Sequence, residues 1–458
     1  MSDPSLSTAV TETEAAAPIT PNYGSLASGV AVTFLTRLII LGCVLGSTVL
    51  VARWLGPEGT GALAVLNVTA ALALQLGSAG LPSAATYFVA RDRNALAAVY
   101  LNGIIFSFTA GVIITSAIIA ISRSRPDLFN GIAPRLITIV ALSIPFQLLT
   151  LLGLNLLLAL DRIRLMNSLD ALSSLLIFVN TMLVLVIWRQ NLAMLVSFNT
   201  GAAIVLSLLT VWFVARSSQR PEQNLLQLTS YSLLQQMLAY GLKFYVSIFA
   251  SFIIFRADLL IVNRYRGAQA AGVYAVAAQM TFLLIMLPGV IASLLFPRVA
   301  ALQDENAEYT VEVTRHTSLV MLIVCAGAAV ASFALPAVYG AAFEEATVLL
   351  LIMLPGVFFI SLESVLVQHF TGTGLPVIIP VFWLITMLVN IGLNLALIPW
   401  WGARAAAINS SISYALIFVL VTACFCRRTG RNPLSLFWPR MREFRNLFMR
   451  LQRRAVAR

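Results

Sequence analysis

The sequence predicts an all-α polytopic membrane protein, with about twelve transmembrane helices arranged in two six-helix lobes. Its composition is apolar: 60% of the residues are hydrophobic and 10% are charged, whereas roughly a quarter are charged in an ordinary soluble domain. Apolar runs recur along the chain, each close to the 20 or so residues that cross a bilayer. The second half of the chain also repeats features of the first. Together these observations predict the fold class.

Twelve apolar runs can be counted between residues 30 and 426. Their approximate limits are 30–51, 60–82, 96–120, 136–158, 166–187, 192–216, 238–262, 271–296, 316–338, 346–370, 376–398 and 404–426. Short loops separate them, which is the pattern of a multi-pass membrane protein.

The internal repeat is clearest in the stretch RWLGPEGTGALAV, at residues 53–65. It recurs 211 residues later as RYRGAQAAGVYAV, at residues 264–276, with Gly56 and Gly61 kept as Gly267 and Gly272. Two asparagine pairs repeat at an offset of 210: Asn180 with Asn390, and Asn199 with Asn409. Because six spans are an even number, both halves enter and leave on the same side of the membrane. A pseudo-two-fold axis along the membrane normal should therefore relate the two lobes.

The predicted organisation has five parts. Residues 1–27 form a disordered cytosolic tail without Lys or Arg, unlike a cleaved signal peptide. Residues 28–216 form the N-lobe with helices 1–6, and residues 238–426 form the C-lobe with helices 7–12. Residues 217–237 are the cytosolic interlobe linker, and residues 427–458 are a basic amphipathic cytosolic tail.

The distribution of arginine predicts that both termini are cytosolic. Ten arginines follow the last span, and positive charge favours the cytosolic side. Apolar residues at helical spacing alternate with these arginines, which predicts a helix lying on the anionic inner-leaflet lipids. Much of the net charge of +11 lies in this tail, so no nucleic-acid partner is expected.

No catalytic or metal site is expected. The first glycine stretch has the spacing of a phosphate-binding loop, but Ala62 and Leu63 replace the Lys and Ser or Thr that such a loop requires. The four cysteines lie in apolar spans without ligand spacing. We therefore expect a protein that is not an enzyme and has no cofactor.

Ionisable residues within membrane spans are costly and usually face a cavity or a partner. Here they are Arg37, Asp170, Lys243, Arg256, Asp258, Glu363 and His369. Arg37 and Lys243 each lie in the first helix of a lobe and could hold an anionic group such as a phosphate, although Lys243 could also extend to the inner surface. For Arg256 and Asp258 a salt bridge to another helix is the alternative. Asp170, Glu363 and His369 are candidate charge partners or proton carriers.

Three stretches carry a resemblance to a known family. They are ARWLGPEGTGALAV at 52–65, RADLLIVNRYRGAQAAGVYAVAAQ at 256–279, and NIGLNLALIPWWGARAAAINSSISY at 390–414. They resemble the Wzx-type polysaccharide flippases of the multidrug/oligosaccharidyl-lipid/polysaccharide exporter superfamily, and the likeness covers about residues 30–426.

This resemblance implies that the chain moves an undecaprenyl-pyrophosphate-linked oligosaccharide across the bacterial inner membrane, by alternating access, for surface or exopolysaccharide synthesis. The head group would cross a cationic cavity between the lobes, with Arg37, Lys243 and Arg256 as substrate-binding candidates. Asp170, Asp258, Glu363 and His369 would be charge partners or coupling residues. Polysaccharide polymerase and export machinery are the protein partners that the resemblance implies.

Two alternatives remain open. A cation-coupled multidrug exporter of the same superfamily would share the fold but needs an acidic cavity, and cations here equal or outnumber carboxylates in the spans. A membrane glycan polymerase or ligase would be expected to present a sizeable outer loop, and the longest here, about residues 121–135, is too short for a domain.

Overall fold

The structure, a computed structural model, describes residues 23–217, 230–302, 307–374 and 376–437. Within these ranges it contains helices and no strand. Ten of the helical segments are long and apolar enough to cross a membrane. Two of them, in α1 (Tyr23–Ser78) and α8 (Tyr231–Leu302), bend at a glycine and hold two spans each. The described part of the chain therefore has the twelve spans that the sequence predicts.

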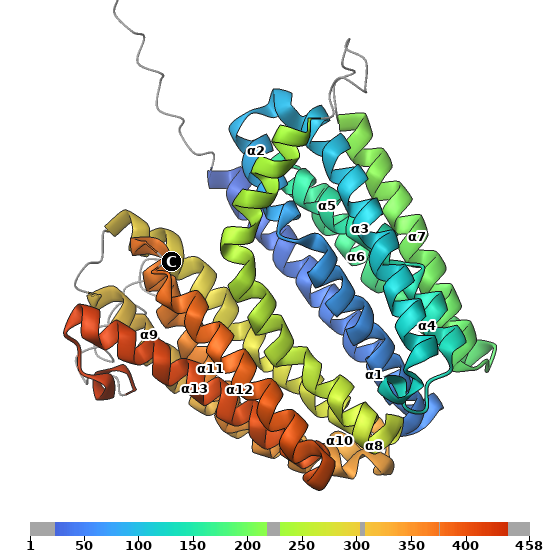
Figure 1. Ribbon diagram of the computed structural model, residues 1–458. Coiled ribbons are helices and arrows are strands. Elements are labelled where there is room, and N and C mark those ends of the chain that lie inside the picture. The colour runs from blue at the N-terminus through green and yellow to red at the C-terminus, as the bar shows by residue number, and fades with distance from the viewer. Residues whose placement is uncertain (1–22, 218–229, 303–306, 375, 438–458) are drawn as a thin grey trace, which may run out of the picture.

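The first six spans form the N-lobe, coloured blue to green in Figure 1. Its elements after α1 are α2 (Leu81–Arg91), α3 (Leu96–Ser124), α4 (Pro134–Ala141), α5 (Ile144–Ala159), α6 (Ile163–Thr181) with a π-helical end at Met182–Ile187, and α7 (Leu192–Ser217). Helices α4 and α5 are two parts of one span.

The second six spans form the C-lobe, coloured yellow-green to red in Figure 1. Its elements after α8 are α9 (Glu308–Ser332), α10 (Leu335–Tyr339), α11 (Glu344–Thr373), α12 (Ile378–Trp401) and α13 (Ala403–Thr429). A buried apolar cluster packs α8, α11, α12 and α13 together.

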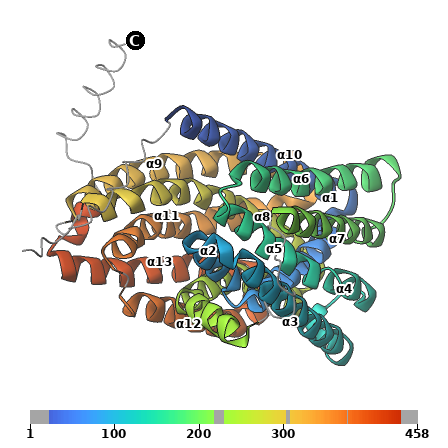
Figure 2. The same cartoon turned by 90° about the horizontal axis from the view of Figure 1, so that it is seen from above.

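The two lobes meet at one end of the molecule, near α10, and diverge toward the other (Figure 1). Seen from above, α9, α11, α12 and α13 lie on the left and α3 to α7 on the right (Figure 2), and in Figure 1 the first half of α8 runs between the lobes. Helices α1 and α8 form the most extensive contact between any two elements. The largest buried apolar cluster combines residues of both helices, so the interface between the lobes is also a core of the protein.

Equivalent kinks in the two halves confirm the repeat. Gly56 bends α1 with φ 65° and ψ −170°, and Gly267 bends α8 with φ 79° and ψ 175°. This backbone region is accessible almost only to glycine. We call the end of the molecule that carries both bends the kink end. The predicted pair of lobes related by a pseudo-two-fold axis is thus confirmed.

The second glycine of each repeat lets the two lobes touch at the kink end. A Cβ atom added to Gly61 would lie 1.8 Å from the carbonyl oxygen of Ala268, and one added to Gly272 would lie 1.9 Å from that of Pro57. Glycine allows this close approach because it has no side chain. The structure shows that these two glycines form an interlobe crossing.

Some predicted limits differ from the observed ones. The ninth span was expected at 316–338, but α9 covers Glu308–Ser332. Arg315 is therefore a buried helical residue instead of a loop residue. The start of α9 buries small polar side chains such as Thr310 and Thr314, and these lower the hydropathy of the segment.

The predicted tails and linker lie mostly outside the described residues. This holds for residues 1–22, for residues 218–229 and for the amphipathic helix expected within residues 438–458. Helix α8 begins at Tyr231, so the last part of the predicted linker 217–237 is helical. The lobe limits at 28–216 and 238–426 stay predictions.

Candidate functional site

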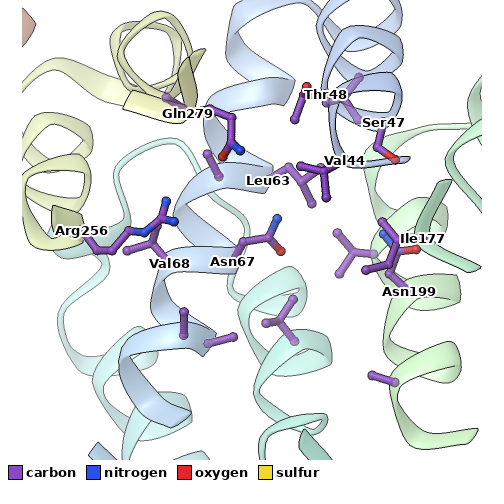
Figure 3. Close-up of a pocket in the computed structure, with 18 of the residues that line it drawn as sticks. Val44, Ser47, Thr48, Leu63, Asn67, Val68, Ile177, Asn199, Arg256 and Gln279 are labelled. Carbon is purple, nitrogen blue, oxygen red and sulfur yellow. The ribbon is translucent and has the colours of Figure 1, made fainter. Parts of the chain in front are cut away.

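A cavity of about 660 Å³ lies within the N-lobe and is closed on one side by α8 (Figure 3). Its walls come from α1, α4, α5, α6 and α7, together with two stretches of α8 and Tyr339 of α10. The cavity is therefore built mainly by one lobe, with the other lobe contributing the wall at the interface.

Amides and hydroxyls supply most of the polar groups of the lining. They are Ser47, Thr48, Thr60, Asn67, Ser143, Gln147, Thr150, Ser173, Thr181, Asn199, Thr200 and Gln279. Many of the hydroxyls already bond to a backbone carbonyl of their own helix, as Thr60 does to Gly56 at 2.7 Å. Within the described residues, the amides of Asn67 and Gln279 make no hydrogen bond to protein. These two amides are available to a ligand.

Asn199 lines the cavity while its repeat partner does not. The Nδ2 atom of Asn180 donates to Oδ1 of Asn199 at 3.3 Å, which leaves the Nδ2 of Asn199 able to donate. In the C-lobe, Asn409 donates to the carbonyl of Asn390 at 2.8 Å, and both residues are fully buried. Asn199 thus borders a cavity in the N-lobe, whereas its repeat partner Asn409 is buried in the C-lobe.

Among the described residues that line the cavity, Arg256 is the one cation. Its guanidinium carbon lies 4.7 Å from the ring centroid of Phe282, also on α8, at cation–π distance. Among the described residues it forms no salt bridge, so the salt bridge considered as an alternative is not seen. Its donors remain free for an anionic ligand group.

Asp258 also borders the cavity, but its carboxylate is buried, with 2% of the residue exposed. Oδ2 accepts hydrogen bonds from the hydroxyl of Tyr274 and, at 3.1 Å, from that of Ser410 on α13. Oδ1 accepts from the backbone N–H of Leu259 at 2.7 Å. Three donors satisfy this carboxylate, so it connects α8 to α13 and is poorly placed to attract a cationic ligand.

Arg37 and Asp170 form an ion pair at 3.0 Å, outside the cavity lining. Their side chains are 50% and 37% exposed. Arg37 lies two helical turns before Val44 on α1, and Asp170 lies one turn before Ser173 on α6, and both of those later residues line the cavity. The pair therefore continues two walls of the cavity away from the kink end.

The remaining predicted site residues lie elsewhere. The backbone of Lys243 belongs to α8, and its side chain lies outside the described residues. Glu363 and His369 are buried on α11 in the C-lobe, away from the cavity lining. His369 contacts the hydroxyl of Thr310 at 3.2 Å, and Oε1 of Glu363 has no hydrogen-bond partner among the described residues. The structure thus brings neither residue to Arg256.

The search for charged residues in the sequence missed the amides of the cavity. Asn67, Gln147 and Gln279 are polar residues within apolar spans, and Asn199 was noted only as a marker of the repeat. An amide in an apolar span also needs a partner or a cavity, and this signal could have identified them.

Comparisons with known proteins place the chain in a family. A family model described as polysaccharide biosynthesis protein matches residues 50–348. No curated protein matches the chain in sequence.

Solved structures share the fold. An inward-facing conformation of a multidrug resistance MATE family transporter of the MOP superfamily matches with a TM-score of 0.69 and 16% identity, over 87% of this chain and 98% of that one. The lipid II flippase MurJ, in an inward closed conformation, matches with a TM-score of 0.68 and 14% identity, over 88% of this chain and 90% of that one. An outward-facing MATE family transporter matches with a TM-score of 0.59 and 15% identity, over 88% and 95%.

These matches agree with the twelve spans and the two lobes, and they confirm the resemblance that the sequence indicated. The chain belongs to the polysaccharide biosynthesis protein family and has the fold of the flippases and transporters of the MOP superfamily.

Proposed function

We propose that the protein is a flippase that moves an undecaprenyl-pyrophosphate-linked oligosaccharide across the bacterial inner membrane, for surface or exopolysaccharide synthesis. The family supports a role in polysaccharide biosynthesis. The observation that carries the proposal is the cavity at the interface of the lobes, whose described lining holds the unbonded amides of Asn67 and Gln279 and a free guanidinium, that of Arg256. Amides can bond sugar hydroxyls, and the guanidinium can bond a phosphate.

The proposed mechanism is alternating access. The lobes meet at the kink end and diverge toward the end where α1 and α8 begin (Figure 1). The arrangement is also more similar to the inward-facing than to the outward-facing MATE structure, with TM-scores of 0.69 and 0.59. We propose that the kink end faces outward, that both termini are cytosolic, and that the lobes rock to expose the cavity on each side in turn.

A cation-coupled drug exporter is the second candidate, because MATE family transporters share the fold. Such a cavity would need a carboxylate that faces the ligand. The one acidic residue bordering this cavity is Asp258, and three hydrogen-bond donors already satisfy it. The oligosaccharide flippase is therefore favoured over the drug exporter, and a polymerase or ligase has no support from the short connection between α3 and α4.

Several parts of the proposal rest on the sequence alone. Asp170, Asp258, Glu363 and His369 stay candidates for coupling transport to an ion, and Asp170 also pairs with the cation Arg37. Contacts with anionic inner-leaflet lipids and with polysaccharide polymerase and export machinery also stay predictions.

A deletion of the gene tests the function directly. We expect lipid-linked oligosaccharide to accumulate in the inner leaflet and surface polysaccharide to disappear. Normal surface polysaccharide without such accumulation would rule out the flippase.

Complementation with variants then tests the site. Arg256→Ala should insert normally and fail to restore export. Arg216→Ala is the matched control, since Arg216 also stacks on an aromatic ring, that of Trp212, but does not line the cavity. If Arg256→Ala restores export as well as Arg216→Ala does, Arg256 does not bind the substrate.

A further inference from the structure

The described lining of the cavity holds one free cation and several amides, and this composition bears on the chemistry of the glycan. Apart from Arg256 and the satisfied Asp258, no residue of the described lining is ionisable at neutral pH. Arg37, which lies beyond the lining, is already neutralised by Asp170 at 3.0 Å. The described lining therefore offers a single anion site.

An acidic sugar would meet no second cation among the described residues of the lining. A carboxylate that leaves water for a protein interior needs a paired charge or several donors. On the proposed function, Arg256 already serves a phosphate of the lipid carrier. A uronic acid would then enter a cavity whose remaining polar groups are neutral, whereas a neutral sugar would lose only hydroxyl hydration, which amides can replace.

The amides are arranged across the cavity. Figure 3 shows Arg256 and Gln279 on the α8 side, Asn67 of α1 near the centre and Asn199 of α7 on the opposite side. Gln279 lies one helical turn before Phe282, the ring on which Arg256 stacks. Each amide offers both a donor and an acceptor, the combination that a sugar hydroxyl can satisfy.

We propose that the transported head group carries uncharged sugars. Asn67, Asn199 and Gln279 determine this specificity by forming hydrogen bonds with the hydroxyls of the sugars. The proposal rests on the proposed function and goes beyond it by naming the class of glycan. Arg256 binds the phosphate end, and the three amides bind the sugars.

The test compares two substrates that differ in one group. The purified full chain is placed in vesicles with an undecaprenyl-pyrophosphate-linked trisaccharide that ends in glucose, or in glucuronic acid. We expect translocation of the glucose compound, and at least tenfold slower translocation of the glucuronic acid compound. Equal or faster movement of the acidic compound would overturn the proposal. If neither compound moves, the proposed function fails, and binding measured by native mass spectrometry still ranks the two head groups.

Variants separate the amides from the fold. Asn67→Leu and Asn199→Leu should each slow translocation of the glucose compound by about 2- to 10-fold, the effect of losing one hydrogen bond. Asn155→Leu is the matched control, because Asn155 is an N-lobe amide that bonds Leu151 and does not line the cavity. Gln279→Lys adds a cation and should raise the rate of the acidic compound relative to the neutral one. If Gln279→Lys leaves the ratio of the two translocation rates unchanged, Gln279 does not determine the specificity for uncharged sugars.

A separate observation concerns the kink end, where two arginines reach across the lobe interface. Arg53 of the N-lobe donates from Nε to the carbonyl of Val338 at 2.8 Å, and from Nη2 to the carbonyl of Ala337. Arg264 of the C-lobe forms an ion pair with Asp127 of the N-lobe at 3.5 Å.

These two contacts are equivalent under the repeat. Arg53 and Arg264 are 211 residues apart, and so are Asp127 and Val338. Each arginine therefore contacts the segment that follows the third span of the opposite lobe: Arg53 contacts α10, and Arg264 contacts Asp127 in the segment after α3. We call Arg53 and Arg264 the arginine clasps. The N-lobe arginine binds backbone carbonyls and the C-lobe arginine binds a carboxylate, so the position of the contact is repeated while its chemistry differs.

We infer that the arginine clasps hold the kink end closed and must release before the lobes can part there. Spin labels on Ala133 of the N-lobe and Ala342 of the C-lobe, both exposed, report the separation at this end by pulsed electron paramagnetic resonance. The double variant Arg53→Ala/Arg264→Ala should move part of the population to longer distances. Arg404→Ala is the control, since it removes an exposed ion pair with Glu345 inside the C-lobe. A distance distribution unchanged in the double variant would refute the role of the clasps.

Discussion

The crossing of Gly61 and Gly272 provides the sharpest structural test. In Gly61→Ala the new Cβ atom would lie 1.8 Å from the carbonyl oxygen of Ala268 and 2.7 Å from the backbone nitrogen of Gly272. Non-bonded atoms prefer about 3.5 Å, so the two backbones would have to part by roughly 1.5 Å. Both contacts are backbone atoms of helices, which cannot turn aside as a flexible side chain can.

The expected cost follows from overpacking. Forcing one extra carbon into a packed contact costs about 1–3 kcal/mol, which corresponds to a change of about 5- to 150-fold in a conformational equilibrium. This cost applies only to the state in which the kink end is closed. Gly61→Ala should therefore favour states in which the lobes are parted at this end, and it should impair export by disfavouring the closed state.

The assay uses the spin labels on Ala133 and Ala342, together with thermal unfolding in detergent. Gly61→Ala should lengthen the interlobe distance and lower the midpoint of unfolding. Gly42→Ala is the matched control on the same helix, because a Cβ there meets nothing within 4 Å, and replacing a helical glycine by alanine stabilises by roughly 0.5–1 kcal/mol. If Gly61→Ala keeps both the wild-type distance and the wild-type midpoint, the reasoning about the crossing is wrong.

Four further predictions follow from the structure. Gly56→Ala should destabilise the protein by about 1–3 kcal/mol, because φ 65° with ψ −170° suits glycine alone, and an unchanged unfolding midpoint would contradict this. Tyr274→Phe should cost about 1.5–3 kcal/mol in unfolding free energy, since it removes a donor to the buried Asp258 carboxylate. A loss below about 0.5 kcal/mol, the least that one hydrogen bond usually contributes, would show that the other two donors are sufficient for this carboxylate. Arg37→Ala should leave abundance unchanged, because its ion pair is exposed, and should impair export if Arg37 contacts substrate, so that wild-type export would assign it a structural role. Hydrogen bonds from Arg125, with the charges of Arg125 and Arg264, lower the pKa of Asp127. The interlobe distance should therefore stay constant from about pH 8 to pH 5 and lengthen only as the pH falls through that lowered pKa. A change near neutral pH would contradict the role of the Arg264–Asp127 ion pair.

The sequence alone was sufficient for the spans and the two lobes. A bilayer requires about 20 apolar residues for each helix, so hydropathy reports the spans directly. The repeat at an offset of 211 residues predicted equivalent turns, and Gly56 and Gly267 indeed share one backbone conformation. Hydropathy and the repeat are both read from the local sequence, and neither depends on how each helix is rotated about its axis.

Only the tertiary structure decided which polar residues face the cavity. Asn199 and Asn409 are repeat partners with nearly the same sequence surroundings, yet one borders the cavity and the other is buried in the C-lobe. Arg37 and Arg256 are both cations within spans, yet only Arg256 lines the cavity, while Arg37 pairs with Asp170. These outcomes depend on the rotation of each helix about its axis and on how completely the neighbouring helices fill the space beside it. Packing between helices, and not the type of residue, determines whether a polar group meets a partner or an open cavity.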